Sequence, residues 1–279
     1  MNTPQAYKTP VRLLGFAAVL ALVFGAAVAA GSVIGPDREP AAGMSHSAPD
    51  PVRGLAVEAD GLELALRQGE LPRGRAAVLA FSIRGDGGRP VRDFDVEHEK
   101  RMHVIVVRRD GRGFQHLHPR LGDDGVWRVQ ATLPDAGAYR VFADFVHDGE
   151  ARTLAADLAV DGEADYGPLP APSAAASTGD GYGVRLDAGR VSAGDEAELR
   201  FSVSRDGVQV RTEPYLGAGG HLVALREGDL AYLHVHPEEH GGPVSFRTEF
   251  PSEGRYRLYL QFKHDGVVHT AEFTQEVAR

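Results

Sequence analysis

The sequence predicts an all-β protein, in which two tandem β-sandwiches follow one apolar N-terminal helix. Three observations support this fold class: a long uncharged segment near the N-terminus, a set of sequence blocks that occurs twice, and short runs of β-branched and aromatic residues closed by turn sequences. The chain has 279 residues, 43% of them hydrophobic and 25% charged, which is the composition of a globular protein. This length is sufficient for two domains.

Residues 1–34 contain the apolar run LLGFAAVLALVFGAAVAAGSVI at 13–34, which carries no charge over 22 residues. As a helix it would reach about 33 Å, enough to cross a bilayer. Lys8 and Arg12 precede it, so the N-terminus is expected inside and the remaining chain outside. A membrane anchor is one interpretation, and a signal peptide cleaved after the small residues 27–29 is the other. The first predicts a single-pass cell-membrane protein with extracytoplasmic domains, the second a secreted protein.

The rest of the chain divides into two similar halves with two segments of low complexity. Residues 35–51 and 161–181 are rich in Pro, Ala, Gly and Ser and are predicted to be a flexible spacer and a linker. The repeats are 52–160 and 182–279. Four pairs of blocks align at an offset of 117 to 120 residues: AFSIRGDG with RFSVSRDG, MHVIVVRRDG with GHLVALREGD, FQHLHP with YLHVHP, and AYRVFADFVHDGEARTLAADLAV with RYRLYLQFKHDGVVHTAEFTQEV.

Each repeat consists of short runs with the composition of strands. LELAL, AAVLAFSI, HVIVV, WRVQATL and YRVFADFV each end at an Asp-Gly, Pro or Gly turn, and extended helical periodicity is absent from the sequence. About seven strands in roughly 100 residues indicate an immunoglobulin-like β-sandwich, with a barrel as the alternative. The Asp-Gly pairs at 148–149 and 265–266 are interpreted as hairpin turns.

Composition excludes several classes of function. The net charge of −9 offers no basic surface for nucleic acid. The absence of cysteine excludes disulfides, thiolate zinc sites and iron–sulfur clusters. The sequence lacks the H-E-x-x-H motif, the G-x-S-x-G motif and a phosphate-binding loop, so a non-enzymatic function is predicted. A zinc hydrolase with three histidine ligands remains the weakest alternative.

Histidine is the residue type that points to a specific chemistry. Eight of the twelve histidines occupy corresponding places in the two repeats: His103, His116, His118 and His147 in the first, and His221, His234, His236 and His264 in the second. In an extended segment the side chains of His116 and His118 lie on one face, and Pro119 favours that conformation. His98, His240 and His269 have no counterpart and are interpreted as surface residues or additions to one site.

The phase of the strands suggests where these histidines point. His147 continues the alternating row of apolar residues from Tyr139 to Phe145, and His103 is in phase with Ile105 and Val107. We therefore predict that all four histidines of a repeat point inward at one rim of its sandwich and share a metal ion. Two further arrangements remain open: a single composite site between the repeats, and histidines that only hydrogen-bond within the fold.

The ligand type indicates the metal. Imidazole without thiolate suits Cu(II), Zn(II) or Ni(II), and copper binds nitrogen ligands more tightly than zinc does. Copper is therefore the first choice and zinc the second. Met102 alternates to the opposite face from His103 and is predicted to lie in the core.

The segments KRMHVIVVRRDGRGFQHLHP, GHLVALREGDLAYLHVHP and YRLYLQFKHDGVVHTAEF resemble a family of membrane-anchored, exported bacterial proteins, mostly uncharacterised and sometimes labelled secreted or heavy-metal-binding. The resemblance covers about residues 52–278 and implies an extracytoplasmic location and a link to copper or another transition metal. In fold the repeats are also similar to the CopC and YtkA-like copper carriers. CopC-type sites use an N-terminal histidine that this chain lacks, so no ligand is transferred from them.

Together these inferences predict an exported, membrane-tethered protein that holds or passes copper, or zinc, through histidine clusters in each repeat. Its expected partners are a metal ion and, through the N-terminal helix, the membrane. The alternative function is a structural or interaction module of tandem β-sandwiches in which the histidines serve the packing.

Overall fold

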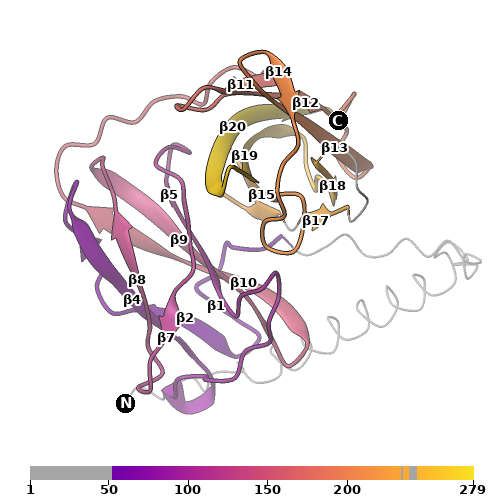
Figure 1. The fold of residues 1–279 in the computed structure, drawn as a ribbon. Coiled ribbons are helices and arrows are strands. Elements are labelled where there is room, and N and C mark those ends of the chain that lie inside the picture. Colours follow the sequence, from indigo (N-terminus) through magenta and orange to yellow (C-terminus); the bar gives the residue numbers. More distant parts are fainter. Residues whose placement is uncertain (1–51, 234, 239–243) are drawn as a thin grey trace, which may run out of the picture. The chain divides into compact units, whose positions relative to one another are not determined.

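A computed structural model describes residues 52–233, 235–238 and 244–279 (Figure 1). Their regular structure is β apart from one short 3-10 turn, η1 (Asp86–Gly88). None of these residues belongs to a helix that is long and apolar enough to cross a membrane. The predicted anchor or signal at 1–34 and the spacer at 35–51 lie outside the described residues. Both repeats belong to one compact unit.

The first repeat is a sandwich of two sheets. One sheet has the order β1 (Glu58–Ala59), β2 (Leu62–Leu66), β4 (Ala76–Arg84), β8 (Trp127–Thr132), β7 (Arg120–Leu121). The other has the order β3 (Glu70–Leu71), β10 (Glu150–Val160), β9 (Gly137–His147), β5 (His103–Arg108), β6 (Gln115–Leu117).

The second repeat has the same two-sheet design. One sheet has the order β11 (Ala175–Ser177), β12 (Tyr182–Asp187), β13 (Glu196–Arg205), β18 (Val244–Glu249), β17 (His236–Pro237), and β14 (Val208–Val210) also pairs with β13. The other has the order β16 (Tyr232–Leu233), β15 (His221–Arg226), β19 (Gly254–His264), β20 (Val267–Val277). The all-β fold of two tandem β-sandwiches is therefore confirmed. Strand β11 lies inside the segment 161–181 that was predicted as a linker. Its backbone pairs with β12, so this part of the segment belongs to the second sandwich.

The longest strands form hairpins at the predicted Asp-Gly turns. Strands β9 and β10 pair from His147 with Glu150 onward, and β19 and β20 pair from His264 with Val267 onward. Both turn residues have positive φ in each case, 54° at Asp148 and 51° at Asp265, followed by glycine at 75° and 74°. This is the geometry that a two-residue hairpin connection requires. The interpretation of these pairs as turns is confirmed.

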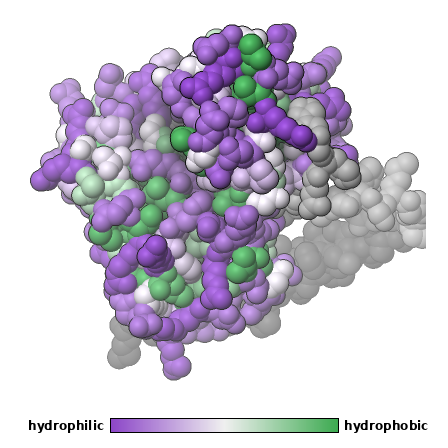
Figure 2. Space-filling view, in the orientation of Figure 1, coloured by the Kyte–Doolittle hydropathy of each residue, from purple (hydrophilic) through white to green (hydrophobic). Residues whose placement is uncertain are grey.

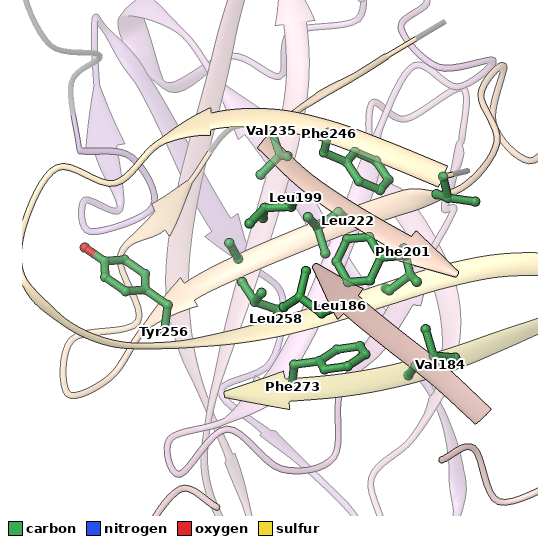
Figure 3. Packing of buried hydrophobic residues seen from close by; sticks show 14 of the residues in the cluster. Val184, Leu186, Leu199, Phe201, Leu222, Val235, Phe246, Tyr256, Leu258 and Phe273 are labelled. Atoms are coloured by element: carbon green, nitrogen blue, oxygen red, sulfur yellow. The ribbon is translucent and has the colours of Figure 1, made fainter. Parts of the chain in front are cut away.

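Each sandwich encloses its own apolar core. In the second repeat the core contains Leu199, Phe201, Leu222, Phe246 and Leu258, which interdigitate between the two sheets (Figure 3). The first repeat has an equivalent core, which includes Met102 as predicted. Strands such as β12 alternate buried and more exposed residues along their length, so one face packs on the core and the other faces outward.

A third apolar cluster joins the two repeats. It is built from the outer faces of the β5, β9 and β10 strands and of the β15, β16 and β19 strands, and contains Ile105, Val107, Phe142, Ala155, Val223, Leu225, Leu230, Tyr232 and Tyr259. The ring of Phe142 lies 5.6 Å from that of Tyr232, and the ring of Phe114 lies 4.1 Å from that of Tyr259. Phe142 aligns with Tyr259, and Phe114 aligns with Tyr232. Each contact therefore joins one position of the first repeat to the equivalent of the other. The interface is therefore pseudo-symmetric.

This interface explains why β5 and β15 are apolar on both faces. All six residues of β5 are buried, Val104 and Val106 in the first core and Ile105 and Val107 against the second repeat. Continuous apolar strands are typical of sheets covered on both sides. Residues in phase with Ile105 therefore point toward the other repeat. The inward direction predicted for them from the alternating pattern was wrong.

Candidate metal centre

Five histidines meet beside this interface, four from the first repeat and one from the second. They come from the turn before β5, from the first residue of β5, from β6 and its continuation, and from the first residue of β15: His98, His103, His116, His118 and His221. Sheet pairing sets their directions. His116 lies opposite Ile105 and so shares its outward face, and His103 is two residues from Ile105 on that face.

The spacing of the rings suits a shared ion. The ring centres of His103 lie 5.2 Å from His116, 5.1 Å from His118 and 5.7 Å from His221. His116 lies 4.7 Å from His118 and 4.5 Å from His221. Two imidazoles bound to one tetrahedral ion at metal–nitrogen distances of about 2.0–2.1 Å have ring centres about 5 Å apart. The nitrogen ligand atoms of His103, His116 and His118 all lie within 4.8 Å of one another.

Burial keeps these imidazoles uncharged. Loss of solvent lowers the pKa of His103, His116, His118 and His221. The pKa lies well below the ordinary value for His116 and His221, and falls to about 4 for His118. Repulsion from neighbouring histidines lowers the pKa values of His116, His118 and His221 further. The hydrogen bond to the Glu97 carbonyl opposes part of this effect at His103. At neutral pH the four rings are therefore in the form that binds metals.

The hydrogen bonds of His103 and His116 place the lone pairs of two ring nitrogens opposite each other. His103 donates its Nε2–H to the carbonyl oxygen of Glu97 at 3.1 Å, and His116 donates its Nδ1–H to Oε1 of Gln261 at 2.6 Å. Each neutral imidazole has only one N–H. Nδ1 of His103 and Nε2 of His116 therefore face each other with lone pairs, 3.0 Å apart. A cation held by both nitrogens removes this repulsion.

Two further ring nitrogens of the group lack a hydrogen-bond partner among the described residues. Nε2 of His118 and Nε2 of His221 are buried and have no hydrogen-bond partner among the described residues. Unpaired buried polar atoms cost free energy and are rare in native proteins. The four histidines together therefore present one opposed pair and two unpartnered nitrogens in the same buried place. Coordination of one ion would satisfy the nitrogens of His103, His116 and His118, whose ligand atoms lie close together, and the ring of His221 lies beside them.

Asp144 supplies negative charge beside the group. It lies directly opposite His103 on β9 and is buried, with 8% of its surface exposed. Thr153 donates a hydrogen bond to it at 2.7 Å and Tyr232 of the second repeat donates another at 3.4 Å. Its charge raises the pKa of His103 and would equally favour a bound cation.

His147 and His264 are not part of this group, contrary to the prediction of four converging histidines in each repeat. His103 pairs with Asp144, so Ala143, Phe145 and His147 project from the opposite face of the sheet. His147 Nδ1 bonds to the Asp93 carbonyl at 2.9 Å, and His264 Nδ1 bonds to the Tyr182 hydroxyl at 3.0 Å. Both lie at hairpin ends on the core side.

The remaining histidines divide as follows. His221, predicted for a site in the second repeat, instead lies with the first-repeat group. His234 lies outside the described residues. The backbone of His236 is in β17, and its side chain is likewise outside the described part. His269 bonds to Asp180 at 2.5 Å and to the carbonyl of His264 at 3.4 Å. Both arrangements left open by the sequence therefore have a counterpart: five histidines from the two repeats gather beside the interface, and His147, His264 and His269 hydrogen-bond within the fold.

Sequence reasoning missed two contributors. Asp144 and Gln261 occupy aligned positions, each opposite the first histidine of a strand, His103 or His221. Both interrupt an apolar run, in VFADFV and LYLQFK, and a polar residue in such a run is a signal of a buried polar contact. His98 was interpreted as a surface residue or an addition to one site, and its ring lies beside the cluster. Its place beside the cluster depends on the turn that precedes β5.

Comparison with known proteins gives a family but no activity. Solved structures that match include FdeC, an adhesin of Escherichia coli (13% identity, TM-score 0.27, 80% of this chain and 66% of that one). Salmonella alpha-2-macroglobulin also matches (14% identity, TM-score 0.29, 82% of this chain and 15% of that one). A chimeric titin Z1Z2 matches as well (15% identity, TM-score 0.22, 80% of this chain and 100% of that one). The chain thus spans less than two thirds of the first two. These TM-scores are too low to carry an argument about function.

No curated protein matches the sequence. A family model described as "Domain of unknown function (DUF8832)" matches it twice, at residues 57–162 and 176–279. The two matches correspond to the two β-sandwiches and together cover most of the chain. The chain therefore belongs to the DUF8832 family, of which it contains two tandem copies.

Proposed function

We propose that this protein binds one transition metal ion between its two β-sandwiches, through His103, His116, His118 and His221. One observation carries the proposal: His103 Nδ1 and His116 Nε2 face each other with lone pairs, 3.0 Å apart. The other nitrogen of each ring donates its N–H to a carbonyl oxygen, of Glu97 or of Gln261. A proton shared by the two nitrogens would stabilise this contact only weakly, because burial lowers the pKa values of His103 and His116. A metal ion resolves it directly.

Copper is the proposed ion and zinc the second choice. Four imidazoles without thiolate suit either metal, and nitrogen ligands bind Cu(II) more tightly than Zn(II). For zinc, the second choice, four protein ligands leave no open position on the tetrahedral ion, whereas catalytic zinc sites keep one open for water or substrate. We therefore infer that the protein holds or passes the ion and does not catalyse a reaction.

The cellular setting is part of the same proposal. The uncharged run at 13–34 behind Lys8 and Arg12 supports export and, if it is retained, a membrane tether. The likeness of the histidine blocks to exported proteins labelled heavy-metal-binding supports the same setting. We also propose that the sandwiches are immunoglobulin-like in their connections, on the strength of their short antiparallel strands and two-sheet cores.

A second candidate function is a structural or interaction module. His147, His264 and His269 favour it, because each already has a hydrogen-bond partner within the fold. The face shown in Figure 2 has its apolar residues in small separate groups among hydrophilic ones, which offers little to an apolar partner. The cluster around His103 is what this alternative does not explain.

Stoichiometry tests the proposed function. We expect the full-length protein, loaded with Cu(II) or with Zn(II) and then freed of excess ion, to retain one ion per chain by elemental analysis. His116→Ala combined with His118→Ala should retain none, since it removes two of the four ligands. His147→Ala is the matched control and should still retain one ion. No retained ion in the wild-type protein would contradict metal binding, and retention by the double variant would contradict this site.

A further inference from the structure

We propose that His98 is the ligand through which the metal ion enters and leaves the buried site. This inference rests on the proposed function, and it concerns the exchange of the ion, as distinct from its final coordination. His98 is half-buried, as are His116, His118 and His221, but Nε2 of His118 and Nε2 of His221 are fully enclosed, and His103 has only 3% of its surface exposed. No nitrogen of His98 is among the buried, unpartnered atoms of the described residues, so this ring contacts the group without being enclosed by it.

The position of the ring supports a role in exchange. Its centre lies 6.2 Å from that of His103 and 6.1 Å from that of His221, at 70° and 73° to the two planes. His103 and His221 are themselves stacked at 10°. His98 thus spans the edge where the two repeats meet. It is about 1 Å farther than the spacing of about 5 Å expected for rings that share one tetrahedral ion.

The backbone under His98 is unusual for its sequence. Glu97 and Lys100 close a tight turn through two reciprocal hydrogen bonds of 2.8 and 3.0 Å. The two central residues, His98 and Glu99, have φ values of 46° and 65°. Such turns normally carry Asn-Gly or Asp-Gly, because side chains disfavour consecutive left-handed conformations. Backbone strain of this kind persists mainly where it serves a site.

The turn is also connected directly to a proposed metal ligand. The carbonyl oxygen that accepts the Nε2–H of His103 belongs to Glu97, the residue before His98. A shift of His103 as it takes up or releases an ion would therefore move the turn that carries His98. The hydrogen bond couples the half-buried imidazole to the buried ones.

Exchange needs such a residue on physical grounds. His103 is buried and Nε2 of His118 and Nε2 of His221 are enclosed, so an ion that left these nitrogens unaided would lose ligands before it gained water. An ion shared by His98 with His103 or His221 keeps nitrogen ligands throughout the passage. Removing His98 should then slow entry and exit by the same factor and leave the equilibrium affinity nearly unchanged.

His98→Asn provides the test, because asparagine tolerates the left-handed conformation and the turn is retained. The rate of Cu(II) loading into the full-length protein, and the rate of its removal by a chromogenic chelator, are measured by stopped flow. The dissociation constant comes from equilibrium competition. We expect both rates to fall about tenfold or more, the scale of effect known for residues that support metal ligands, with little change in affinity. Glu99→Asn, at the neighbouring strained position, should exchange metal at the wild-type rate.

Three outcomes would overturn the inference. Wild-type exchange rates in His98→Asn would show that the imidazole takes no part in exchange. Loss of affinity with unchanged loading would make His98 a permanent ligand. An equal slowing in Glu99→Asn would assign the effect to the turn and not to the imidazole. Absence of bound copper in the wild-type protein would instead overturn the proposed function itself.

Discussion

The outward-facing histidines at the interface and the inward-phase histidines at the hairpin ends form two contrasting groups. His147 and His264 each have a hydrogen-bond partner, a backbone carbonyl or a tyrosine hydroxyl. In the interface group, by contrast, two lone pairs oppose each other and two nitrogens have no partner within the described residues. The comparison shows that histidines repeated in both copies can have different surroundings. The two groups differ in whether their ring nitrogens have hydrogen-bond partners.

The cause of the difference is the pairing of two neighbouring strands. His103 lies opposite Asp144 on β9, so every second residue from Asp144 shares its face and the residues between, which include His147, face the core. A shift of one residue in this register would exchange the two groups.

The largest expected effect separates the two groups in the second repeat. His221→Ala should weaken metal binding by about a hundredfold, about 2.7 kcal/mol, because the first repeat alone supplies only three of the four ligands. His264→Ala should leave affinity unchanged, since that ring bonds to Tyr182. Competition with a chelator of known affinity measures both. Equal losses in the two variants would contradict the contrast between the groups.

Metal should also stabilise the fold through the interface group only. A ligand that binds the folded state alone adds about 2.7 kcal/mol of stability when its concentration is a hundredfold above its dissociation constant. We expect thermal unfolding of the wild-type protein and of His147→Ala to shift upward with added Zn(II). His221→Ala should show a much smaller shift at the same concentration. A chelator added to the wild-type protein should return its transition to the metal-free position.

The pH dependence of the metal-free protein sharpens the comparison further. Burial lowers the pKa values of His103, His116, His118 and His221 below the unfolded value of about 6.5, to about 4 for His118. Between the folded and unfolded values the unfolded chain binds more protons. Stability should therefore fall as the pH decreases from 7 toward 4. Urea unfolding across this range should give a shallower dependence for His116→Ala combined with His118→Ala, and identical slopes would contradict the assignment.

The smallest effect concerns a residue that orients a ligand. Gln261 accepts the Nδ1–H of His116 at 2.6 Å and thereby leaves Nε2 free for a metal. Gln261→Leu keeps the approximate size and removes the acceptor, so affinity should fall about tenfold, or about 1.4 kcal/mol. Thr270→Val is the control, because Thr270 contacts only the far side of that amide, at 3.5 Å. A wild-type affinity in Gln261→Leu would show that the orientation of His116 does not depend on this bond.

Much of the fold could be predicted because it follows from local patterns. The Asp-Gly turns, the short β-branched runs and the two aligned halves each depend on residues close together in sequence. The grouping of His116 with His118 was predictable for the same reason, since alternate residues of an extended segment share a face. The continuous apolar run HVIVV is typical of a strand covered on both faces, and all of its residues are buried.

The sequence by itself determined the chemistry of this protein: two β-modules, no thiolates, and histidines repeated at matching places. Only the tertiary structure decided which histidines meet, because this depends on the register of neighbouring strands and on the packing of one sandwich on the other. The packing joins residues more than a hundred positions apart. His116 bonds to Gln261, and His103 stacks on His221 across the same interface. No periodicity along the chain encodes such a contact.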